Sequence, residues 1–379
     1  MGQVYIIEAA RTPVGKKNGA LKDIHPVNLA AIPLRELAQR AGVQAALIED
    51  VLLGCVSQVS EQTFNIARNA LLTAGYAIET PGVTIDRQCG SSQQAAHFAA
   101  ALIASGANDL LAVGGVESMS RIPLGSSAQI GNPYPKELLD LYELTNQGIA
   151  AERIAEKWSI SRRAMEEFAL ESHRRSAAAQ LRGDFTAEIV PVPLADGALF
   201  REDEGIRPQT SLEQMATLKP AFLPDGKITA AVSSQISDGA AALLLASEKA
   251  VQHYALKPRA RIVAHRVVGS DPVLMLTGPV AATERVLQDA NISLDEIDIF
   301  EVNEAFACVP LMWLQETHAD PQKMNVNGGA IALGHPLGAT GAKLLTGMLY
   351  ELERRGARYG LQTMCCGGGM ATATIIERL

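Results

Sequence analysis

The chain has 379 residues, of which 47% are apolar and 20% charged, so it can bury a large core and is long enough for two or three structural units. Its net charge of −8, without any run of Lys or Arg, argues against a nucleic-acid binder. The five cysteines show no CxxC spacing, which argues against a disulfide framework and a zinc site.

The start of the chain, residues 1–10, has no basic stretch followed by a long apolar run. No later segment approaches the roughly eighteen uninterrupted apolar residues that span a bilayer. We therefore expect a cytoplasmic protein without a membrane partner. An anionic ligand would need a local basic site.

A strand, helix, strand pattern occurs in the N-terminal third. Residues 83–86 have strand character, and a short turn leads into an Ala-rich helical stretch at 92–104 that Gly106 ends. The apolar run 110–113 predicts the next strand. Such a unit builds a buried, largely parallel sheet.

The middle of the chain, residues 119–235, is polar and interrupted by prolines around one good helix. Ser161 can cap this helix and Gly183 can end it. An insertion of this kind either covers a site built by the sheets or forms a peripheral stabilising lobe, and its position alone does not decide between them.

The C-terminal third repeats the pattern of the first. In chain order it has a strand at 298–302, a helix-compatible stretch at 304–313, residues 324–327 with a Gly-rich loop, a helix from about 340 to 355 capped by Gly356, and a strand at 360–365. Similar elements in both thirds indicate a duplicated α/β architecture.

The first candidate for chemistry is Cys89, which lies where a strand ends and a helix begins. The first backbone N–H groups and the helix dipole would favour its thiolate there. This position suits a nucleophile. Cysteine is also often a small buried hydrophobe, so Cys89 alone does not establish catalysis.

The second candidate lies in the Gly-rich loop 325–341, where His335 stands between Gly334 and Pro336. Closely spaced glycines let backbone approach backbone or a ligand. A lone histidine in a loop is usually structural. A loop this rich in glycine has no packing value to offset its entropy cost, however, which favours a functional role.

Two further elements complete the set. Residues 363–370 form a strand that ends in the adjacent thiols Cys365 and Cys366 and three glycines, whose N–H groups could bind an oxyanion or which could simply make a tight turn. Asn303 and Glu304 directly follow a strand, at the end where α/β proteins gather their sites. Asn303 alone could as easily cap a helix.

Together the four elements resemble signatures of the thiolase family, and they occur in that family's order. Cys89-Gly-Ser-Ser resembles the nucleophile motif, and the segments that begin at Asn303, Gly334 and Cys365 resemble the three C-terminal blocks. The resemblance covers the whole chain and implies an α/β fold of two similar halves, each with a mixed, mainly parallel sheet and helices on its faces. The implied division is an N-terminal half at 1–118 with 236–258 returning to it, an inserted loop domain at 119–235 that binds coenzyme A, and a C-terminal half at 259–379.

The resemblance also implies catalytic roles. Cys89 would be the nucleophile that becomes acylated, and His335 would take its proton and later polarise the thioester oxygen. Cys365 would be the second acid/base. Asn303 would hold a water that joins His335 in one oxyanion hole, and the backbone N–H groups of Cys89 and Gly367 would form the other.

For coenzyme A, the resemblance implicates Ser234 and the backbone around Ala230 at the pantetheine, and Arg207 and Phe222 at the nucleotide. An arginine near phosphate and an apolar ring near adenine are physically reasonable. Coenzyme A and acyl-CoA would be substrates, with no further cofactor and no metal. A homodimer or homotetramer is expected.

The implied reaction is reversible thiolytic cleavage of a 3-oxoacyl-CoA, and the run from Gly148 to the terminal Glu377-Arg-Leu most resembles degradative bacterial thiolases, including those of steroid breakdown. Two departures, Ser92 where many thiolases have Gly and Asn146 where many have His, could change the acyl preference. The alternatives are a biosynthetic acetoacetyl-CoA thiolase, a ketosynthase-like condensing enzyme, or a non-catalytic lipid carrier or scaffold. Cys365 in place of a second histidine disfavours the ketosynthase.

Overall fold

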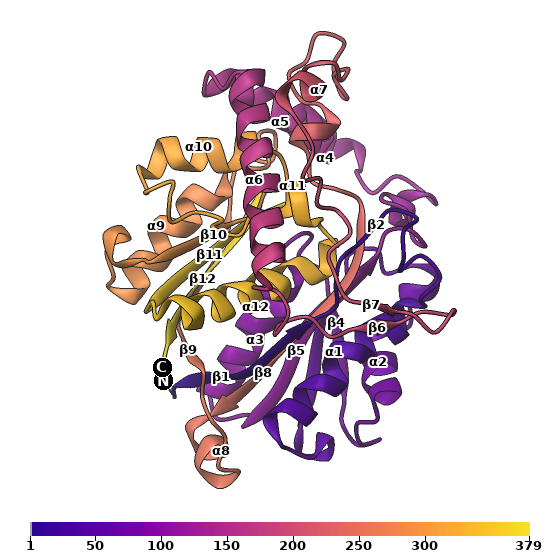
Figure 1. The fold of residues 1–379 in the computed structure, drawn as a ribbon, viewed down its shortest axis with the longest axis vertical. Coiled ribbons are helices and arrows are strands. Elements are labelled where there is room, and N and C mark those ends of the chain that lie inside the picture. The colour runs from indigo at the N-terminus through magenta and orange to yellow at the C-terminus, as the bar shows by residue number, and fades with distance from the viewer. Residues whose placement is uncertain (1) are drawn as a thin grey trace.

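The computed structural model describes residues 2–379 and contains a large mixed sheet of ten strands (Figure 1). The order is β10-β11-β12-β9-β1-β8-β5-β3-β4, with β2 paired to β8. We call one part the N sheet: β1 (Val4–Arg11), β2 (Gly15–Lys16), β3 (Asp50–Gly54), β4 (Gly82–Ile85), β5 (Leu110–Ser118) and β8 (Ser237–Ser247). The C sheet comprises β9 (Ala260–Gly269), β10 (Ile299–Val302), β11 (Tyr359–Cys366) and β12 (Met370–Arg378).

Both sheets contain parallel as well as antiparallel strand pairs. In the N sheet, β3 pairs in parallel with β4 and β5, and β8 runs antiparallel between β5 and β1. In the C sheet, β10 and β11 are parallel, and β12 is antiparallel to β11 and β9. A short ladder of Tyr5 with Arg261 and Ile6 with Ala260 joins the sheets. The predicted mixed α/β fold is confirmed.

The helices form three layers around the two sheets (Figure 1). On the outer face of the N sheet lie α1 (Pro26–Ala41) and α2 (Ile66–Ala74), and on that of the C sheet lies α9 (Gly278–Ala290) with α10 (Cys308–Thr317) beside it. Between the sheets, α3 (Ser91–Ala104) packs on α12 (Leu337–Arg355). Four core positions of α3 are alanines: Ala95, Ala96, Ala99 and Ala100. Because these side chains are small, the neighbouring elements can approach α3 closely.

Glycines in the N sheet let both central helices start directly on the strands. A Cβ atom on Gly54 would lie 2.4 Å from the Ser92 nitrogen, and one on Gly115 would lie 2.0 Å from the Gly338 oxygen. The strand predicted at 110–113 is confirmed as β5, which is longer than predicted and continues through Gly115 to Ser118. The starts of α3 and α12 consequently lie near each other, toward the carboxyl ends of β3 and β5.

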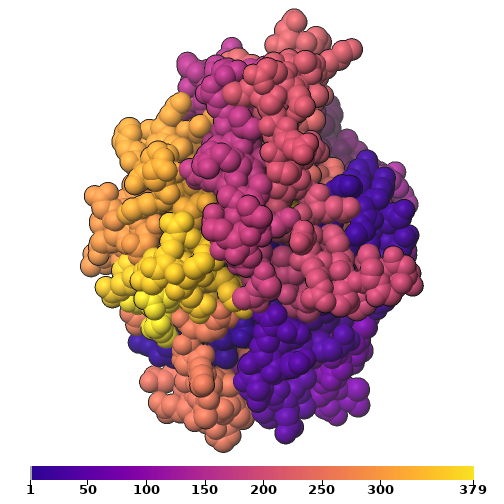
Figure 2. All heavy atoms as spheres, in the orientation of Figure 1, coloured from indigo at the N-terminus to yellow at the C-terminus, as the bar shows by residue number. Residues whose placement is uncertain are grey.

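The middle segment, magenta to pink, lies on the molecular face between the indigo N-terminal part and the yellow C-terminal part (Figures 1 and 2). The predicted helix is confirmed as α6 (Arg162–Arg182), with Ser161 Oγ accepting from the Ala164 N–H at 3.1 Å and Gly183 in the left-handed region. The other elements of this segment are α4 (Lys136–Leu141), α5 (Gln147–Lys157), the β6 (Val192–Pro193) and β7 (Leu199–Phe200) pair, and α7 (Leu212–Ala216); α8 (Glu248–His253) and α11 (Ala330–Leu333) lie further along the chain.

The helix predicted at 304–313 is wrong at its start, because α10 begins only at Cys308. Residues 303–307 instead bond to the segment 232–234. The Ser234 N–H donates to the Ala305 oxygen at 2.9 Å, and the Ala307 N–H donates to the Val232 oxygen at 2.8 Å. These long-range bonds replace the helical hydrogen bonds that local sequence favours.

Candidate active site

Cys89 occupies the turn between β4 and α3. Ser91 shapes this turn, since its hydroxyl accepts from the Arg87 N–H at 2.9 Å and donates to the Gln88 oxygen at 2.5 Å. Gln88 takes a left-handed conformation, with φ of 50°. Cys89 is thereby held one residue before Gly90, the N-cap of α3, with 3% of its surface exposed.

The surroundings of the Cys89 sulfur are mostly apolar. It packs with Met364 on β11 and with Leu337 and Leu344 on α12. Burial raises the pKa of Cys89 to about 12, although the backbone N–H groups of Gly367 and Cys89 itself oppose this shift. The backbone N–H groups at the helix start thus favour the thiolate, as expected, but burial outweighs them, so the Cys89 thiol needs a base.

His335 is fixed in one tautomer directly before α12. Thr340 Oγ1 donates to the Pro336 oxygen at 2.8 Å, so it accepts from His335 Nδ1–H at 2.6 Å. This leaves Nε2 unprotonated. The His335 N–H donates to Ser237 Oγ at 3.2 Å, and Gly334, with φ of 91°, has no room for a Cβ beside the same oxygen.

Asn303 lies beside the free nitrogen of this ring. Its Nδ2 is 3.4 Å from His335 Nε2, and its N–H donates to the Thr363 oxygen on β11 at 3.1 Å. Burial, followed by the charge of Lys343, lowers the pKa of His335 to about 3, so the imidazole is neutral. Asn303 Oδ1 is buried and has no hydrogen-bond partner within residues 2–379. Across the same residues, no hydrogen bond joins His335 to the Cys89 sulfur.

Glu304 follows Asn303 and connects the neighbouring segments through three hydrogen bonds. Its carboxylate accepts from Ser172 Oγ at 2.7 Å, Asn325 Nδ2 at 2.9 Å and the Ile331 N–H at 3.1 Å. It thus ties α6 and the Gly-rich loop to the end of β10. None of these bonds reaches the His335 ring, so Glu304 supports the site from outside.

The two adjacent thiols at the end of β11 face different surroundings. Cys365 is fully buried in the cluster that includes Phe306 and Cys308, whereas the Cys366 sulfur lies against Gly90 on the opposite face. Burial, followed by the proximity of Cys89, raises the pKa of both thiols above the ordinary value. Both are therefore protonated at neutral pH.

Two glutamines that sequence reasoning missed flank Gly367. A Cβ placed on Gly367 would lie 3.1 Å from both Gln147 Nε2 and Gln88 Oε1. Asn146 directly precedes Gln147 and caps α5, because its Oδ1 accepts from the Ile149 N–H at 3.0 Å. No local motif marks the glutamines, since only the fold brings them to the glycine turn.

Ser92, the other departure from the family pattern, links the two central helices. Its hydroxyl accepts from the Ala342 N–H of α12 at 2.9 Å. Ser92 is fully buried, so the hydroxyl needs this partner. The serine thus adds a bond between the helices that carry the two halves of the site.

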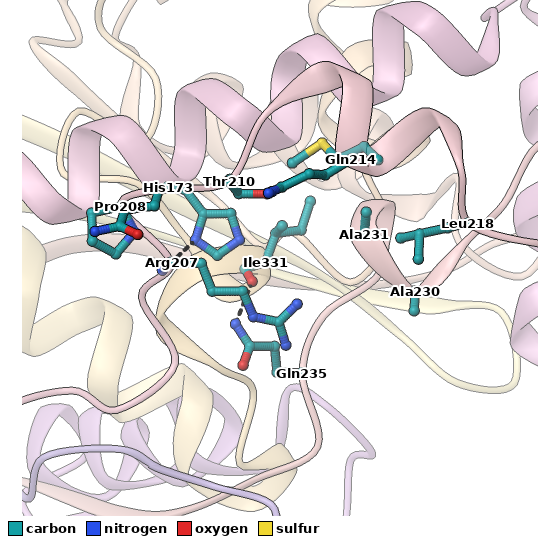
Figure 3. Close-up of a pocket in the computed structure, with 12 residues that line it drawn as sticks. His173, Arg207, Pro208, Thr210, Gln214, Leu218, Ala230, Ala231, Gln235 and Ile331 are labelled. Atoms are coloured by element: carbon teal, nitrogen blue, oxygen red, sulfur yellow. Dashed lines mark hydrogen bonds between the residues drawn. The ribbon is translucent and has the colours of Figure 1, made fainter.

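A pocket of about 440 Å³ opens in the middle segment (Figure 3). The polar side chains of His173, Arg207 and Gln235 lie apart from the apolar side chains of Leu218 and Ala230. His173 Nδ1 accepts from the Arg207 N–H at 3.1 Å, and burial lowers the pKa of His173 to about 4. The pocket therefore offers one cationic group beside an apolar wall.

The other two predicted coenzyme A residues do not line this pocket. Phe222 is 38% exposed and meets the Phe306 ring edge-on at 5.9 Å. Ser234 is half-buried, and its N–H donates a hydrogen bond to the Ala305 oxygen. Phe306, which the Phe222 ring contacts and which bridges to Ser233, shares a buried cluster with Cys365.

In the described chain, residues 2–379, no three His, Cys, Asp or Glu side chains are grouped so as to hold a metal ion. No helix in this range is long and apolar enough to cross a membrane. The reactive groups of the site are three buried thiols, Cys89, Cys365 and Cys366, and the neutral imidazole of His335.

Comparison with known proteins agrees with this geometry. The family model "Thiolase, N-terminal domain" matches residues 4–249, and "Thiolase, C-terminal domain" matches 256–378. A steroid 3-ketoacyl-CoA thiolase, FadA6, of Mycobacterium tuberculosis is 52% identical over 100% of this chain and 95% of its own length. A 3-ketoacyl-CoA thiolase of Klebsiella pneumoniae is 44% identical over 100% of both chains.

A solved structure shows the same architecture. The Bacillus anthracis acetyl-CoA acetyltransferase superposes with a TM-score of 0.92 and 38% identity, over 100% of this chain and 99% of its own. The chain belongs to the thiolase family. The family predicted from the four motifs and its two-halved α/β fold are thereby confirmed.

Proposed function

We propose that the chain catalyses the cleavage of a 3-oxoacyl-CoA by coenzyme A, giving acetyl-CoA and a shortened acyl-CoA through an acyl group on Cys89. The observation that carries this proposal is the placement of a buried thiol at the start of α3, a neutral imidazole with a free Nε2 at the start of α12, which packs on α3, and a second buried thiol at the end of β11. Relatives named 3-ketoacyl-CoA thiolases support the cleavage direction.

In the first half of the reaction, His335 Nε2 accepts the proton of Cys89 as the sulfur attacks the 3-oxo carbon. The bond from this carbon to the α-carbon breaks, and its electron pair stays on the α-carbon of the departing acetyl-CoA. Cys365, which burial keeps as a thiol, protonates that carbon. The products of this half are acetyl-CoA and acyl-Cys89.

In the second half, the Cys365 thiolate takes the proton of an incoming coenzyme A thiol, whose sulfur attacks the acyl carbon. Cys89 leaves as a thiolate and recovers its proton from His335. The N–H groups of Cys89 and Gly367 would stabilise one oxyanion, supported by their effect on the Cys89 sulfur. A water on Asn303 would join His335 in the other, supported by the unpaired Asn303 Oδ1.

Two candidates remain for the acyl group of the substrate. The 52% identical relative is named a steroid 3-ketoacyl-CoA thiolase, which supports a branched or ring-derived substrate. The structural relative is named an acetyl-CoA acetyltransferase, so an acetoacetyl-CoA thiolase is the second candidate. Comparing kcat/KM for straight-chain and branched 3-oxoacyl-CoA substrates would decide, and equal values would remove the branched preference.

The predicted homodimer or homotetramer is retained as a proposal. The outer strand of the N sheet, β4, has an unpaired edge, and the apolar side chains Phe64, Ile78 and Val83 are exposed on the segments around it. A second copy could cover this edge. Sedimentation at a single-chain mass would contradict the proposal. The cytoplasmic location stays a prediction.

We also propose that coenzyme A binds in the pocket lined by Arg207 and Ala230, with its nucleotide beside Arg207 and its pantetheine beside the Ala230 backbone. Steady-state cleavage of acetoacetyl-CoA with varied coenzyme A tests function and pocket together. The wild type should cleave only when coenzyme A is present. Arg207→Ala should raise KM for coenzyme A about tenfold and leave kcat within about twofold, because a phosphate contact far from the reacting atoms binds substrate and transition state alike.

The matched control is Arg163→Ala, which removes an exposed arginine of α6 that pairs with Glu167 outside the pocket. It should leave both constants unchanged. A wild type that does not cleave the substrate would contradict the function. Cleavage with an unchanged KM in Arg207→Ala would contradict the pocket alone.

A further inference from the structure

The buried carboxylate of Glu117 has no place in the reaction proposed above, yet it lies close to both reactive turns. Glu117 stands near the end of β5 and has no exposed surface. Four N–H donors converge on it. Its Oε2 accepts from Val56 at 2.9 Å and Gly338 at 3.0 Å, and its Oε1 accepts from Ser57 at 3.1 Å and Gln62 Nε2 at 2.8 Å.

This set of partners defines the chemical state of the side chain. Every donor is an N–H group, so neither carboxylate oxygen has an acceptor to which it could give a proton. Burial raises the pKa of Glu117, but the four hydrogen bonds favour the ionised form. The carboxylate is thus an anion whose acceptor capacity is used by three separate segments.

One of these bonds caps α12. The N-cap residue, Pro336, provides no side-chain hydrogen bond to the first turn, and the Gly338 N–H belongs to that turn. Glu117 supplies the missing acceptor from another strand and places a negative charge at the positive end of a 19-residue helix.

The first turn of α12 carries the contacts that set the site. Thr340 fixes the tautomer of His335, and Leu337 packs on Cys89. The Gly338 backbone lies so close to Gly115 that the turn cannot shift toward the sheet. A bond that prevents it from shifting away therefore fixes the imidazole relative to the thiol.

The charge of Glu117 argues against a direct role at the sulfur. It raises the pKa of Cys89, which opposes formation of the nucleophile. A charge placed there for activation would have the opposite sign. Its function must lie in its hydrogen bonds.

We propose that Glu117 is a positioning residue for the reaction, which holds the first turn of α12 so that His335 Nε2 faces Cys89. The inference rests on the proposed function of the site. Glu117 acts through Gly338 and Thr340 and does not touch the reacting atoms.

Glu117→Gln tests this with little change in shape. A glutamine has one acceptor oxygen, so its NH₂ group would face two N–H donors and two of the four bonds would be lost. We expect kcat per folded protein to fall about 10- to 100-fold, with KM for coenzyme A within about threefold, because a misplaced catalytic group slows the chemical step. Hydrogen exchange of the peptide 334–342 should become faster.

Asp298→Asn is the matched control. Asp298 precedes β10, at the end away from Asn303, and its carboxylate accepts from the Arg358 and Tyr359 N–H groups at 2.8 and 3.0 Å. Both N–H groups bond to Oδ2, which the amide oxygen of asparagine can replace, so this acid-to-amide change away from the site should leave kcat and the exchange of 334–342 unchanged.

Gln62→Met provides a second test that keeps the carboxylate and its backbone donors. It removes one donor to Glu117, together with the bonds of Gln62 to the Ser57 oxygen and the Ser118 N–H, and we expect kcat to fall about 3- to 10-fold with an unchanged KM. A Glu117→Gln kcat within twofold of wild type, or a lower kcat with unchanged exchange of 334–342, would overturn the proposal. If Glu117→Gln does not fold, an unaffected Gln62→Met overturns it. An inactive wild type would instead contradict the proposed function.

Discussion

Cys365→Ala should abolish exchange of the α-protons of acetyl-CoA with solvent while Cys89 still accepts an acetyl group. Acetyl transfer to Cys89 needs only the nucleophile, its base and the oxyanion donors, which the substitution leaves in place. Removal of an α-proton needs a second base. We assign this role to Cys365 because it lies in the buried cluster with Phe306, whereas Cys366 lies against Gly90 on the other face of β11.

Cys366→Ala is the matched control for this experiment. The two thiols follow each other on β11, so their side chains point to opposite faces, and the Cys366 sulfur lies against Gly90. Exchange in Cys366→Ala should stay within a few-fold of wild type. Deuterium uptake into acetyl-CoA, followed by mass spectrometry, measures both variants. Exchange that is lost in Cys366→Ala and kept in Cys365→Ala would reverse the assignment.

His335→Ala should lower kcat about 10²- to 10⁴-fold, the range typical of a lost general base. The effect should be large because Cys89 is a buried thiol whose pKa is raised to about 12, so it cannot ionise at neutral pH without a proton acceptor. The neutral His335, with Nε2 free, is suited to that task.

Alkylation of Cys89 by iodoacetamide near pH 7 measures this role without a substrate. The rate should fall in His335→Ala and remain at the wild-type value in His253→Ala, which removes an exposed histidine on α8. An unchanged rate in His335→Ala would remove this residue from activation of the thiol.

Several parts of the fold were predictable because their signals are local. Ser161 and Gly183 bound α6 as expected, since an N-cap hydroxyl and a left-handed glycine act within one turn. Cys89 was also placed correctly between a strand and a helix. The sequence order of the motifs was sufficient to indicate the family.

Other features depend on contacts between distant segments and left no local pattern. Residues 304–307 were predicted as the start of a helix, but their bonds to 232–234 keep them outside α10. Gln147 reaches Gly367 only through the fold, and Glu117 reads as an ordinary residue at the end of an apolar strand. Burial likewise reverses the ionisation that the helix start at Cys89 suggests. The roles of the site residues and the domain limits stay predictions.

The central claim is that Cys89 carries the acyl group between two coenzyme A molecules. Incubation with acetyl-CoA without free coenzyme A, followed by rapid acid quenching, proteolysis and mass spectrometry, tests it most directly. An acetyl group on the peptide that contains Cys89, removed when coenzyme A is added before the quench, is the predicted result. An acetyl group found only on Cys365, Cys366 or another cysteine would contradict the account.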